Sequence, residues 1–440
     1  MSMLFRLIRL AGLALAAFTL LALTGPMAGA QSGEGEGPSV YIPIVPEVGR
    51  RYKLAICDLA PLNGRSDRNA TYLPERLTAN LAMTGLFTNL DRRSFLETNL
   101  LAGVDGSSPD YTAWSRIGAD FLIKGGLSSS GSSLTLDMRL FDVGLSKEML
   151  AKRYSGPAKD ARRMINQFTN AVLEAITGVP GVFGSQIIFT TGPAAKKTIM
   201  ITELGSDEAT AVAGNRGGPS TQPTLGPGGR MAWIHRNGTS WELLLDGKVV
   251  SSGPTHLSPA FKPDGTLVAA YSEPLKTSIF TFSGRSKTLL TGPGGINVSP
   301  TFSPDGSRMA FVSDLDGSVG IYTSPASGGA PGKLPITGKA TDPAWSPTGE
   351  FIVFVSRETD ICIIRPDGSG YRQLTGGQGS NYRPSFSPDG RLIVFSSTRN
   401  GREQLFVMSA NGDSQQLLLP ELSANQDLPY WCPTMPAAYK

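Results

Sequence analysis

The chain is poor in the residues that most enzyme and metal sites require. Its 440 residues include two histidines, His235 and His256, and three cysteines, Cys57, Cys362 and Cys432. Neither histidine stands in a metal-binding spacing such as H-E-x-x-H, and the cysteines form no CxxC pair. The sequence therefore predicts no metal site, and the three thiols, each in an apolar run, are expected to be buried.

Other catalytic and cofactor motifs are also missing. No G-x-S-x-G elbow occurs, and the Gly-Pro-Gly-Gly stretches do not follow a strand and open a helix, as a phosphate-binding loop does. We therefore expect no cofactor and no catalytic residues, which favours a binding protein over an enzyme.

Charge is scarce and nearly balanced. Asp, Glu, Lys and Arg make up 17% of the chain, and without Arg6 and Arg9 it has 38 basic and 36 acidic residues. No cluster of Lys and Arg interleaves with aromatic residues, which makes nucleic acid an unsuitable partner.

The one long apolar run lies at the N-terminus. Arg6 and Arg9 precede LAGLALAAFTLLAL, and a small-x-small triplet, Ala28-Gly29-Ala30, follows it. The run is shorter than the roughly 20 residues of a membrane-spanning helix, although a membrane anchor is the alternative. We predict that residues 1–30 are a signal peptide, cleaved between Ala30 and Gln31, and that the mature protein is exported without stable membrane insertion.

Residues 31–50 are expected to form a flexible arm. A Gly- and Glu-rich stretch, SGEGEGPS, precedes VYIPIVPEVGR, in which Pro43 and Pro46 disfavour a helix or a central strand. Exposed apolar residues on such an arm suggest docking onto the protein or a partner. These residues are Val40, Tyr41, Ile42, Ile44 and Val45.

Residues 51–182 alternate strand and helix patterns, which predicts a small α/β domain. KLAICDL reads as a buried strand, and PERLTANLAMTGLF as an amphipathic helix with Pro74 near its start. DFLIKGGLSSS and SLTLDMRLFDV read as a hairpin of strands. A helix in AKDARRMINQFTNAVLEAITG should end at Gly178.

Residues 183–440 carry one motif repeatedly, as in RPSFSPDGRLIVFSST and SPTFSPDGSRMAFVSD. Pro, Asp and Gly suit a tight turn between an inner strand and a buried second strand. The copies recur every 36 to 45 residues, which is typical of β-propeller blades. The first prolines of the copies are Pro223, Pro259, Pro300, Pro343, Pro384 and Pro429.

The last copy holds only a first strand, LPYWCP, whereas residues 186–213 hold three strands without a first one. The two ends should therefore complete one blade together. The predicted fold is α+β with two domains: a small N-terminal α/β domain followed by a six-bladed β-propeller closed by the C-terminal strand.

This combination resembles the TolB family, the periplasmic propellers of the Tol–Pal system of Gram-negative bacteria. LTANLAMTGLFTNLDRRSF and AWSRIGADFLIKGGL resemble segments of the family's N-terminal domain, and the Ser-Pro-Asp-Gly blades resemble its propeller. The resemblance implies a periplasmic scaffold that supports outer-membrane integrity and constriction in cell division, and we expect a monomer. Its implied partners are the lipoprotein Pal, on the propeller face, and TolA, on the arm.

The loops before the inner strands are the candidate Pal site. In the family, a loop histidine before this blade's proline takes part in Pal binding, and His256 precedes Pro259. A polar rim with one aromatic residue suits a protein partner. The candidate residues are His256, Asn297, Asp342, Asn381, Tyr382, Arg383 and Asp427.

Two other classes of function stay open. A propeller hydrolase or lyase would need a pocket lined by histidines and carboxylates on the propeller axis. The chain has only two histidines, which argues against such a pocket. A small-ligand or sugar-binding propeller would need a ligand site in the same place. Binding to Pal, or hydrolysis of a peptide or polysaccharide, discriminates these classes.

Overall fold

The computed structural model describes residues 51–64, 67–213, 217–273, 276–284, 286–292 and 294–433. The predicted signal peptide and arm lie outside this part of the chain and stay predictions. They include the cleavage site at Ala30 and Gln31, and the apolar arm residues Val40, Tyr41, Ile42, Ile44 and Val45.

The N-terminal α/β region is built on one mixed sheet with the strand order β3-β1-β4-β5-β6, and β2 pairs with β4. The strands are β1 (Tyr52–Ile56), β2 (Ala60–Pro61), β3 (Phe87–Asn89), β4 (Phe121–Ser130), β5 (Ser133–Asp142) and β6 (Lys147–Pro157). The helices are α1 (Asn69–Met83), α2 (Tyr111–Arg116) and α3 (Ala161–Thr177), with short 3-10 turns η1 (Arg92–Ser94) and η2 (Ala158–Asp160).

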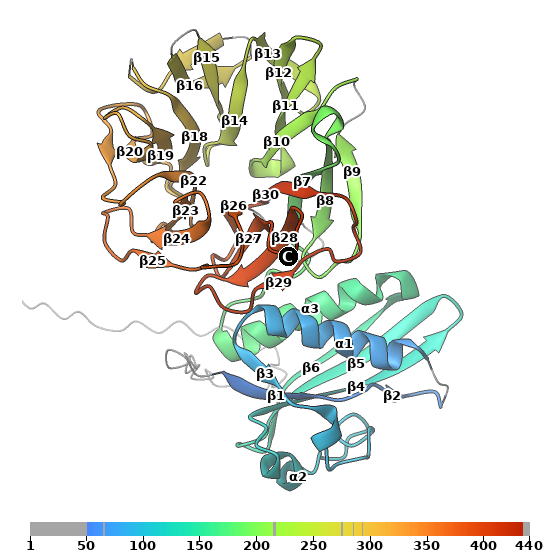
Figure 1. The fold of residues 1–440 in the computed structure, drawn as a ribbon. Helices are drawn as coiled ribbons and strands as arrows, with labels where there is room; N and C mark the ends of the chain where they lie inside the picture. Colours follow the sequence, from blue (N-terminus) through green and yellow to red (C-terminus); the bar gives the residue numbers. More distant parts are fainter. Residues whose placement is uncertain are drawn as a thin grey trace, which may run out of the picture. The chain divides into compact units, whose positions relative to one another are not determined.

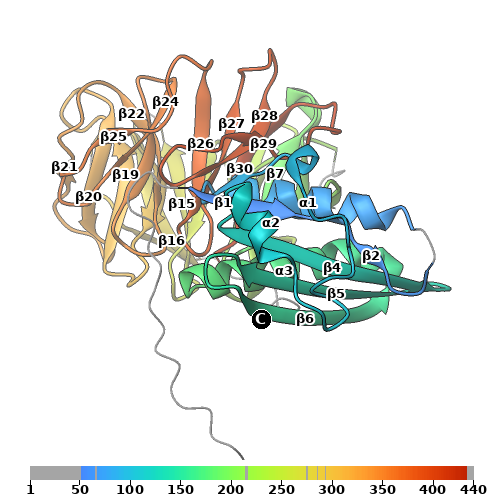
Figure 2. The same cartoon turned by 90° about the horizontal axis from the view of Figure 1, so that it is seen from below.

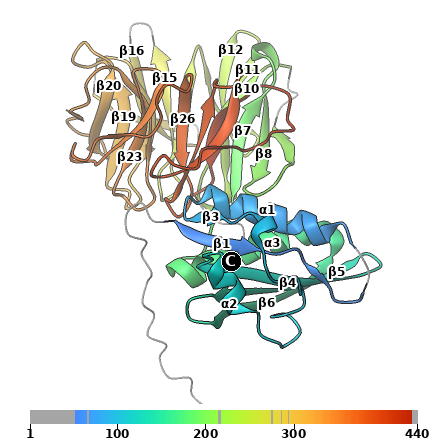
Figure 3. The same cartoon turned by 60° about the horizontal axis from the view of Figure 1, so that its bottom comes forward.

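Helices cover both faces of this sheet. Leu77 of α1 and Phe168 of α3 belong to the same buried cluster as Leu136 of β5, whereas Trp114 of α2 packs with Leu122 on the opposite side. Figure 3 shows α1 and α3 on one side of the sheet and α2 on the other. In Figure 2, β4, β5 and β6 run side by side as long strands. The expected hairpin of β4 and β5 is confirmed.

The first helix begins earlier than the sequence suggested. We expected Pro74 near the helix start, but α1 begins at Asn69 and contains Pro74 inside it. Proline has no N–H to donate to the carbonyl four residues before it. In this helix that carbonyl belongs to Ala70, and the backbone N–H of Leu59 donates to it at 2.9 Å. The connection after β1 thus satisfies the carbonyl that Pro74 leaves free.

The end of α3 was predicted correctly, whereas strand β6 was not predicted. Gly178 caps α3 with a left-handed φ of 75°, and its N–H donates to the carbonyl of Glu174. Such a φ is favourable for glycine because it lacks a Cβ. The predicted boundary of the α/β domain, residue 182, lies in the connection between α3 and β7. That boundary stays a prediction.

The C-terminal region is a six-bladed β-propeller, and Figure 1 shows its blades around a central axis. In chain order, blades 1 to 5 are β10–β13, β14–β17, β18–β21, β22–β25 and β26–β29. Blade 6 has the order β30-β7-β8-β9. The predicted closure by the C-terminal strand is thereby confirmed.

Each of blades 1 to 5 begins with its inner strand and ends with its outermost strand. The strands of blades 1 and 2 are β10 (Ser220–Leu225), β11 (Met231–Asn237), β12 (Ser240–Leu245), β13 (Lys248–Gly253), β14 (His256–Phe261), β15 (Leu267–Glu273), β16 (Lys276–Ser283) and β17 (Ser286–Leu289). Those of blades 3 and 4 are β18 (Asn297–Phe302), β19 (Arg308–Ser313), β20 (Gly320–Pro325), β21 (Gly332–Lys333), β22 (Ala340–Trp345), β23 (Ile352–Ser356), β24 (Asp360–Ile364) and β25 (Arg372–Gln373).

Blades 5 and 6 complete the ring. Their strands are β26 (Asn381–Phe386), β27 (Leu392–Ser397), β28 (Gln404–Ser409), β29 (Gln416–Leu417), β30 (Gln426–Trp431), β7 (Gln186–Thr191), β8 (Thr198–Glu203) and β9 (Ala209–Ala213). Two 3-10 turns, η3 (Ala194–Lys196) and η4 (Pro227–Gly229), lie in connections.

The repeat residues pack as their chemistry requires. Phe302, the aromatic residue of the third copy, lies in one buried cluster with Val268 and Ile279 of the preceding blade. The second strand β27 is buried at all six positions. The three cysteines are buried, as expected, and none is part of a disulfide.

The α/β region and the last two blades share a hydrophobic cluster. It contains Phe168 of α3, Phe183 of the connection, Leu405 of β28 and Trp431 of β30. Arg391, in the turn of blade 5, also donates to Thr177 Oγ1 at 3.0 Å. Among the described residues, no helix has the length and apolar character needed to cross a membrane.

Candidate functional site

The six inner strands all start with a buried side chain. These first residues are Ser220, His256, Asn297, Ala340, Asn381 and Gln426. We call the end of the propeller where the inner strands start the rim face, and the end with the Ser-Pro-Asp-Gly turns the turn face. His256, Asn297 and Asn381 were expected in loops on the rim, but each is the first residue of a strand and is buried.

His256 is enclosed by its own blade and the preceding one. Its Nε2 lies 2.9 Å from Ser251 Oγ, and its ring meets Tyr271 edge to face at 5.0 Å between centroids. Its pKa is lowered from 6.5 to about 4, chiefly by burial and then by the positive charge of Lys287, while a hydrogen bond with the backbone of Trp241 raises it. The imidazole is therefore neutral at pH 7.

The two asparagines at the rim face form hydrogen bonds with neighbouring strands and connections. Asn297 donates through Nδ2 to the carbonyls of Thr277 (3.1 Å) and Gly294 (3.0 Å). Asn381 donates to the carbonyl of Thr359 at 2.7 Å and accepts from Arg399 at 3.1 Å. These bonds satisfy donors of the two buried amide side chains, which would cost about 1–3 kcal/mol each if left unpaired. They shape the rim from inside, and direct contact with a partner stays a prediction for His256, Asn297 and Asn381.

Gln426 plays the same part in the closing blade. Its Nε2 donates to the carbonyls of Leu419 (3.2 Å) and Leu422 (3.0 Å). Sequence reasoning named its neighbour Asp427 and missed Gln426. The signal was present, since Gln426 stands three residues before Pro429, as Asn297 and Asn381 stand before Pro300 and Pro384.

Asp427 belongs to the seam that closes the ring. Its carboxylate forms an ion pair with Lys197 and accepts a hydrogen bond from Thr190 Oγ1 of β7. The pKa of nearby Glu403 is raised by burial and then by the charge of Asp427, while Lys197 lowers it. Asp427 thus joins the C-terminal strand β30 to β7 and to Lys197, which precedes β8, within blade 6.

A β-bulge follows the second residue of every inner strand. In all six strands the register with the next strand shifts at this point. The residue before each first proline has a left-handed backbone, with φ between 49° and 53°. These residues are Gln222, Ser258, Ser299, Asp342, Arg383 and Leu428. None is glycine, although such a conformation costs other residues about 1–3 kcal/mol.

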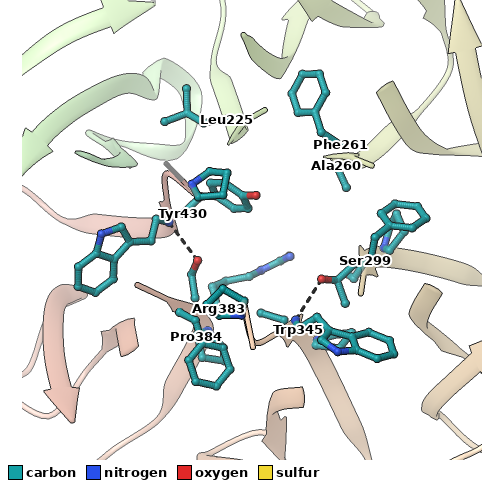
Figure 4. Close-up of a pocket in the computed structure, with 18 of the residues that line it drawn as sticks. Leu225, Ala260, Phe261, Ser299, Trp345, Arg383, Pro384 and Tyr430 are labelled. Carbon is teal, nitrogen blue, oxygen red and sulfur yellow. Dashed lines mark hydrogen bonds between the residues drawn. The ribbon is translucent and has the colours of Figure 1, made fainter. Parts of the chain in front are cut away.

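These six residues line a cavity on the propeller axis with a volume of about 420 Å³ (Figure 4). Its wall also contains both prolines of every repeat, twelve in total, together with the inner-strand aromatic side chains. The wall is therefore mostly apolar, and polar groups concentrate at the bulges. We call this cavity the channel.

The polar groups of the channel are partly paired with one another. Arg383 Nε lies 3.1 Å from Asp342 Oδ1, which joins blades 4 and 5. Gln222 Oε1 accepts from the backbone N–H of Ser258, whose Oγ lies 3.3 Å from Ser299 Oγ. Asp342 and Arg383 were predicted as rim residues, and the structure places both at the channel wall.

Tyr382 is half-buried at the second position of β26. It lies between buried Asn381 and the channel residue Arg383. Of the predicted rim residues, Asp342, Tyr382, Arg383 and Asp427 keep partly exposed side chains.

The repeat aspartates serve the turns, as expected. Asp305 accepts from the hydroxyls of Ser303 and Ser307 and from the backbone N–H of Ser307, and these bonds lower its pKa to about 2. Asp389 accepts equivalent bonds from Ser387 and from the N–H of Arg391. No group of three or more metal-ligating side chains occurs in the described part of the chain.

Comparisons with known proteins agree with this architecture. A family model described as the TolB amino-terminal domain matches residues 40–149, and one described as the TolB beta propeller domain matches residues 173–435. The solved structure of TolB from Acinetobacter baumannii superposes with a TM-score of 0.76 at 22% identity, covering 88% of this chain and 97% of that one. It shows that the fold is shared.

Curated relatives carry the same name. Protein TolB homolog of Chlorobium luteolum is 30% identical over 378 residues, which are 85% of this chain and 67% of the relative. Tol-Pal system protein TolB of Syntrophotalea carbinolica is 33% identical over 178 residues, or 40% of this chain and 41% of the relative. That of Syntrophus aciditrophicus is 32% identical over 43% of each chain, so the chain matches less than half the length of these two relatives. Since the propeller model covers more than half of the chain and the Chlorobium relative is matched over two thirds of its length, the chain belongs to the TolB family of Tol-Pal system proteins.

Proposed function

We propose that this chain is a periplasmic, non-enzymatic scaffold that binds the lipoprotein Pal on the rim face of its propeller. The observation that carries the proposal is the match of both regions to TolB family models. The family's Tol-Pal name implies other components of that system as partners. Pal binding would support outer-membrane integrity and constriction during cell division.

The structure supports the rim face as the docking surface. The buried amides of Asn297, Asn381 and Gln426 hold its connections in fixed positions, and a pre-organised surface loses less entropy on binding. The bonds from Arg391 to α3 start at the turn face, at the opposite end of the blade. Tyr382 and Asp427 offer a partly exposed aromatic and a partly exposed acidic group on the rim side, whereas Asp342 and Arg383 lie at the channel wall.

Tyr382 is the expected anchor, because aromatic residues dominate binding energy at protein interfaces. Tyr382→Ala should weaken Pal binding by roughly 30-fold, or about 2 kcal/mol, in isothermal titration calorimetry with purified Pal. Tyr371→Ala is the matched control, since Tyr371 is 50% exposed and directly precedes β25, the outermost strand of blade 4. Equal affinities of the two variants would remove Tyr382 from the interface, and an unaltered protein that does not bind Pal would contradict the whole proposal.

We propose further that residues 40–45 of the arm bind TolA. Deleting residues 31–48 should abolish TolA binding and leave the thermal unfolding of the protein unchanged, because the described core starts at β1. The measurement is titration of both proteins with TolA. Retained binding after the deletion would show that the arm is not the TolA site.

Pal binding and release of the arm are expected to be coupled. Pal must then change the affinity for TolA by the same factor by which TolA changes the affinity for Pal.

A further inference from the structure

Charge is rare on the channel wall. Of the described residues that line it, only Lys262, Asp342 and Arg383 carry a formal charge. The remaining lining is proline, aromatic, aliphatic or neutral polar. Most copies carry a neutral residue at the matching positions, so the propeller fold does not require these charges, and they point to a role in the cavity.

Lys262 replaces a residue of the turn. In the third and fifth copies this position is Ser303 or Ser387, whose hydroxyl bonds the aspartate of the same turn. Lys262 has no hydroxyl group. Its ammonium group donates instead to the carbonyl of Ala326 at 2.9 Å and lies 5.7 Å from the centre of the Phe302 ring. A positive charge is thus held at the wall by the neighbouring blade.

Arg383 supplies the second positive charge. It keeps a left-handed backbone with φ of 51°, a conformation that glycine would adopt without strain. Its Nε is paired with Asp342, whereas no hydrogen bond joins its two Nη atoms to a described residue, and a third of its side chain is exposed. In Figure 4 its side chain extends into the centre of the cavity. The guanidinium therefore has donors available inside an apolar cavity.

We propose that the channel binds a small organic carboxylate, with the carboxylate on Arg383 and the apolar body among the prolines and aromatic rings. A planar guanidinium matches a carboxylate in geometry. Two positive charges and one negative charge leave the wall with an excess of one, which suits a monoanion. The volume of about 420 Å³ lies in the range of small-molecule sites.

The test uses phenylacetate as the probe and its neutral amide, phenylacetamide, as the matched ligand. Trp345 and Trp431 line the channel, so their fluorescence reports occupancy alongside calorimetry. Phenylacetate at millimolar concentration should bind and raise the unfolding temperature, and the amide should bind at least 10-fold more weakly. Equal binding of the two ligands, or no binding of phenylacetate, would overturn the proposal.

Three variants locate the site. Arg383→Gln should weaken phenylacetate binding at least 10-fold, whereas Asp342→Asn should strengthen it several-fold, because the guanidinium loses its competing partner. Arg230→Gln is the control, since Arg230 pairs with Asp246 outside the channel lining. An unchanged affinity in Arg383→Gln would place the ligand elsewhere and refute the assignment. All measurements use the protein without Pal or TolA, so their failure leaves the proposed partner binding untouched.

Discussion

At the scale of single residues, the repeat predicts the role of the turn aspartates but not the burial of the polar side chains that begin the inner strands. Asp305 and Asp389 could be assigned to turns from Ser-Pro-Asp-Gly alone, because the bonds they accept are local. The burial of Asn297 and Asn381 could not be foreseen, because their partners are carbonyls of other strands and connections. Polar side chains before a strand resemble loop residues in sequence, although here they fill the interior.

His256 shows this difference most clearly, and its burial predicts a pH effect. The pKa of His256 is about 4 in the native protein, against 6.5 for an exposed imidazole. Well above pH 6.5 both the folded and unfolded states carry the neutral ring, so His256 contributes no pH dependence there. Between pH 6.5 and about 4 the unfolded state binds a proton that the folded state does not, so the free energy of unfolding must fall as the pH falls.

Urea unfolding from pH 7.5 to 4.5 checks this expectation. His256→Gln should flatten the decline relative to the unaltered protein, whatever its effect on stability at pH 7.5. Lys287→Gln should give an intermediate slope, because the Lys287 charge is the second cause of the lowered pKa. A decline of equal steepness in His256→Gln would show that other groups produce the pH dependence.

At the scale of elements, sequence periodicity identified the blades but not every strand or boundary. The second strands were predictable because they are apolar at nearly every position, as β27 is. Strand β6 was missed because it is an edge strand that pairs only with β5 and has no fully buried side chain. Its sequence, KEMLAKRYSGP, is therefore largely polar and lacks the apolar run of a buried strand. The start of α1 was misplaced because the bond that compensates for Pro74 comes from Leu59, outside the helix.

The inner strands show why the candidate site could be predicted only in part. The copies marked where the inner strands lie, and hence which residues lie near the axis. The bulge before each proline was not predicted, because it requires a left-handed backbone at residues such as Arg383 and Leu428 that rarely adopt it. This bulge turns Asp342 and Arg383 from expected rim residues into residues of the channel wall.

At the scale of the whole molecule, one hydrophobic cluster is shared by the α/β region and blades 5 and 6, so the stability of each should depend on the other. Phe183 lies at the centre of the connection, fully buried, and its backbone N–H and carbonyl both bond the side chain of Asn170 in α3, at 2.9 Å each. Phe168 of α3 and Leu405 of blade 5 belong to the same cluster. Blades 3 and 4 form a separate cluster around Phe354, which contains no residue of the α/β region.

This arrangement predicts different responses to two matched substitutions. Phe183→Ala and Phe354→Ala each remove a fully buried phenylalanine and should each cost about 3–5 kcal/mol. In native-state hydrogen exchange, Phe183→Ala should accelerate exchange in α3 and in blades 5 and 6 together, because one cluster stabilises them all. Phe354→Ala should accelerate exchange in blades 3 and 4 and leave α3 unchanged. If Phe183→Ala accelerated exchange in the α/β region alone, the shared cluster would not couple the stability of that region to the stability of blades 5 and 6.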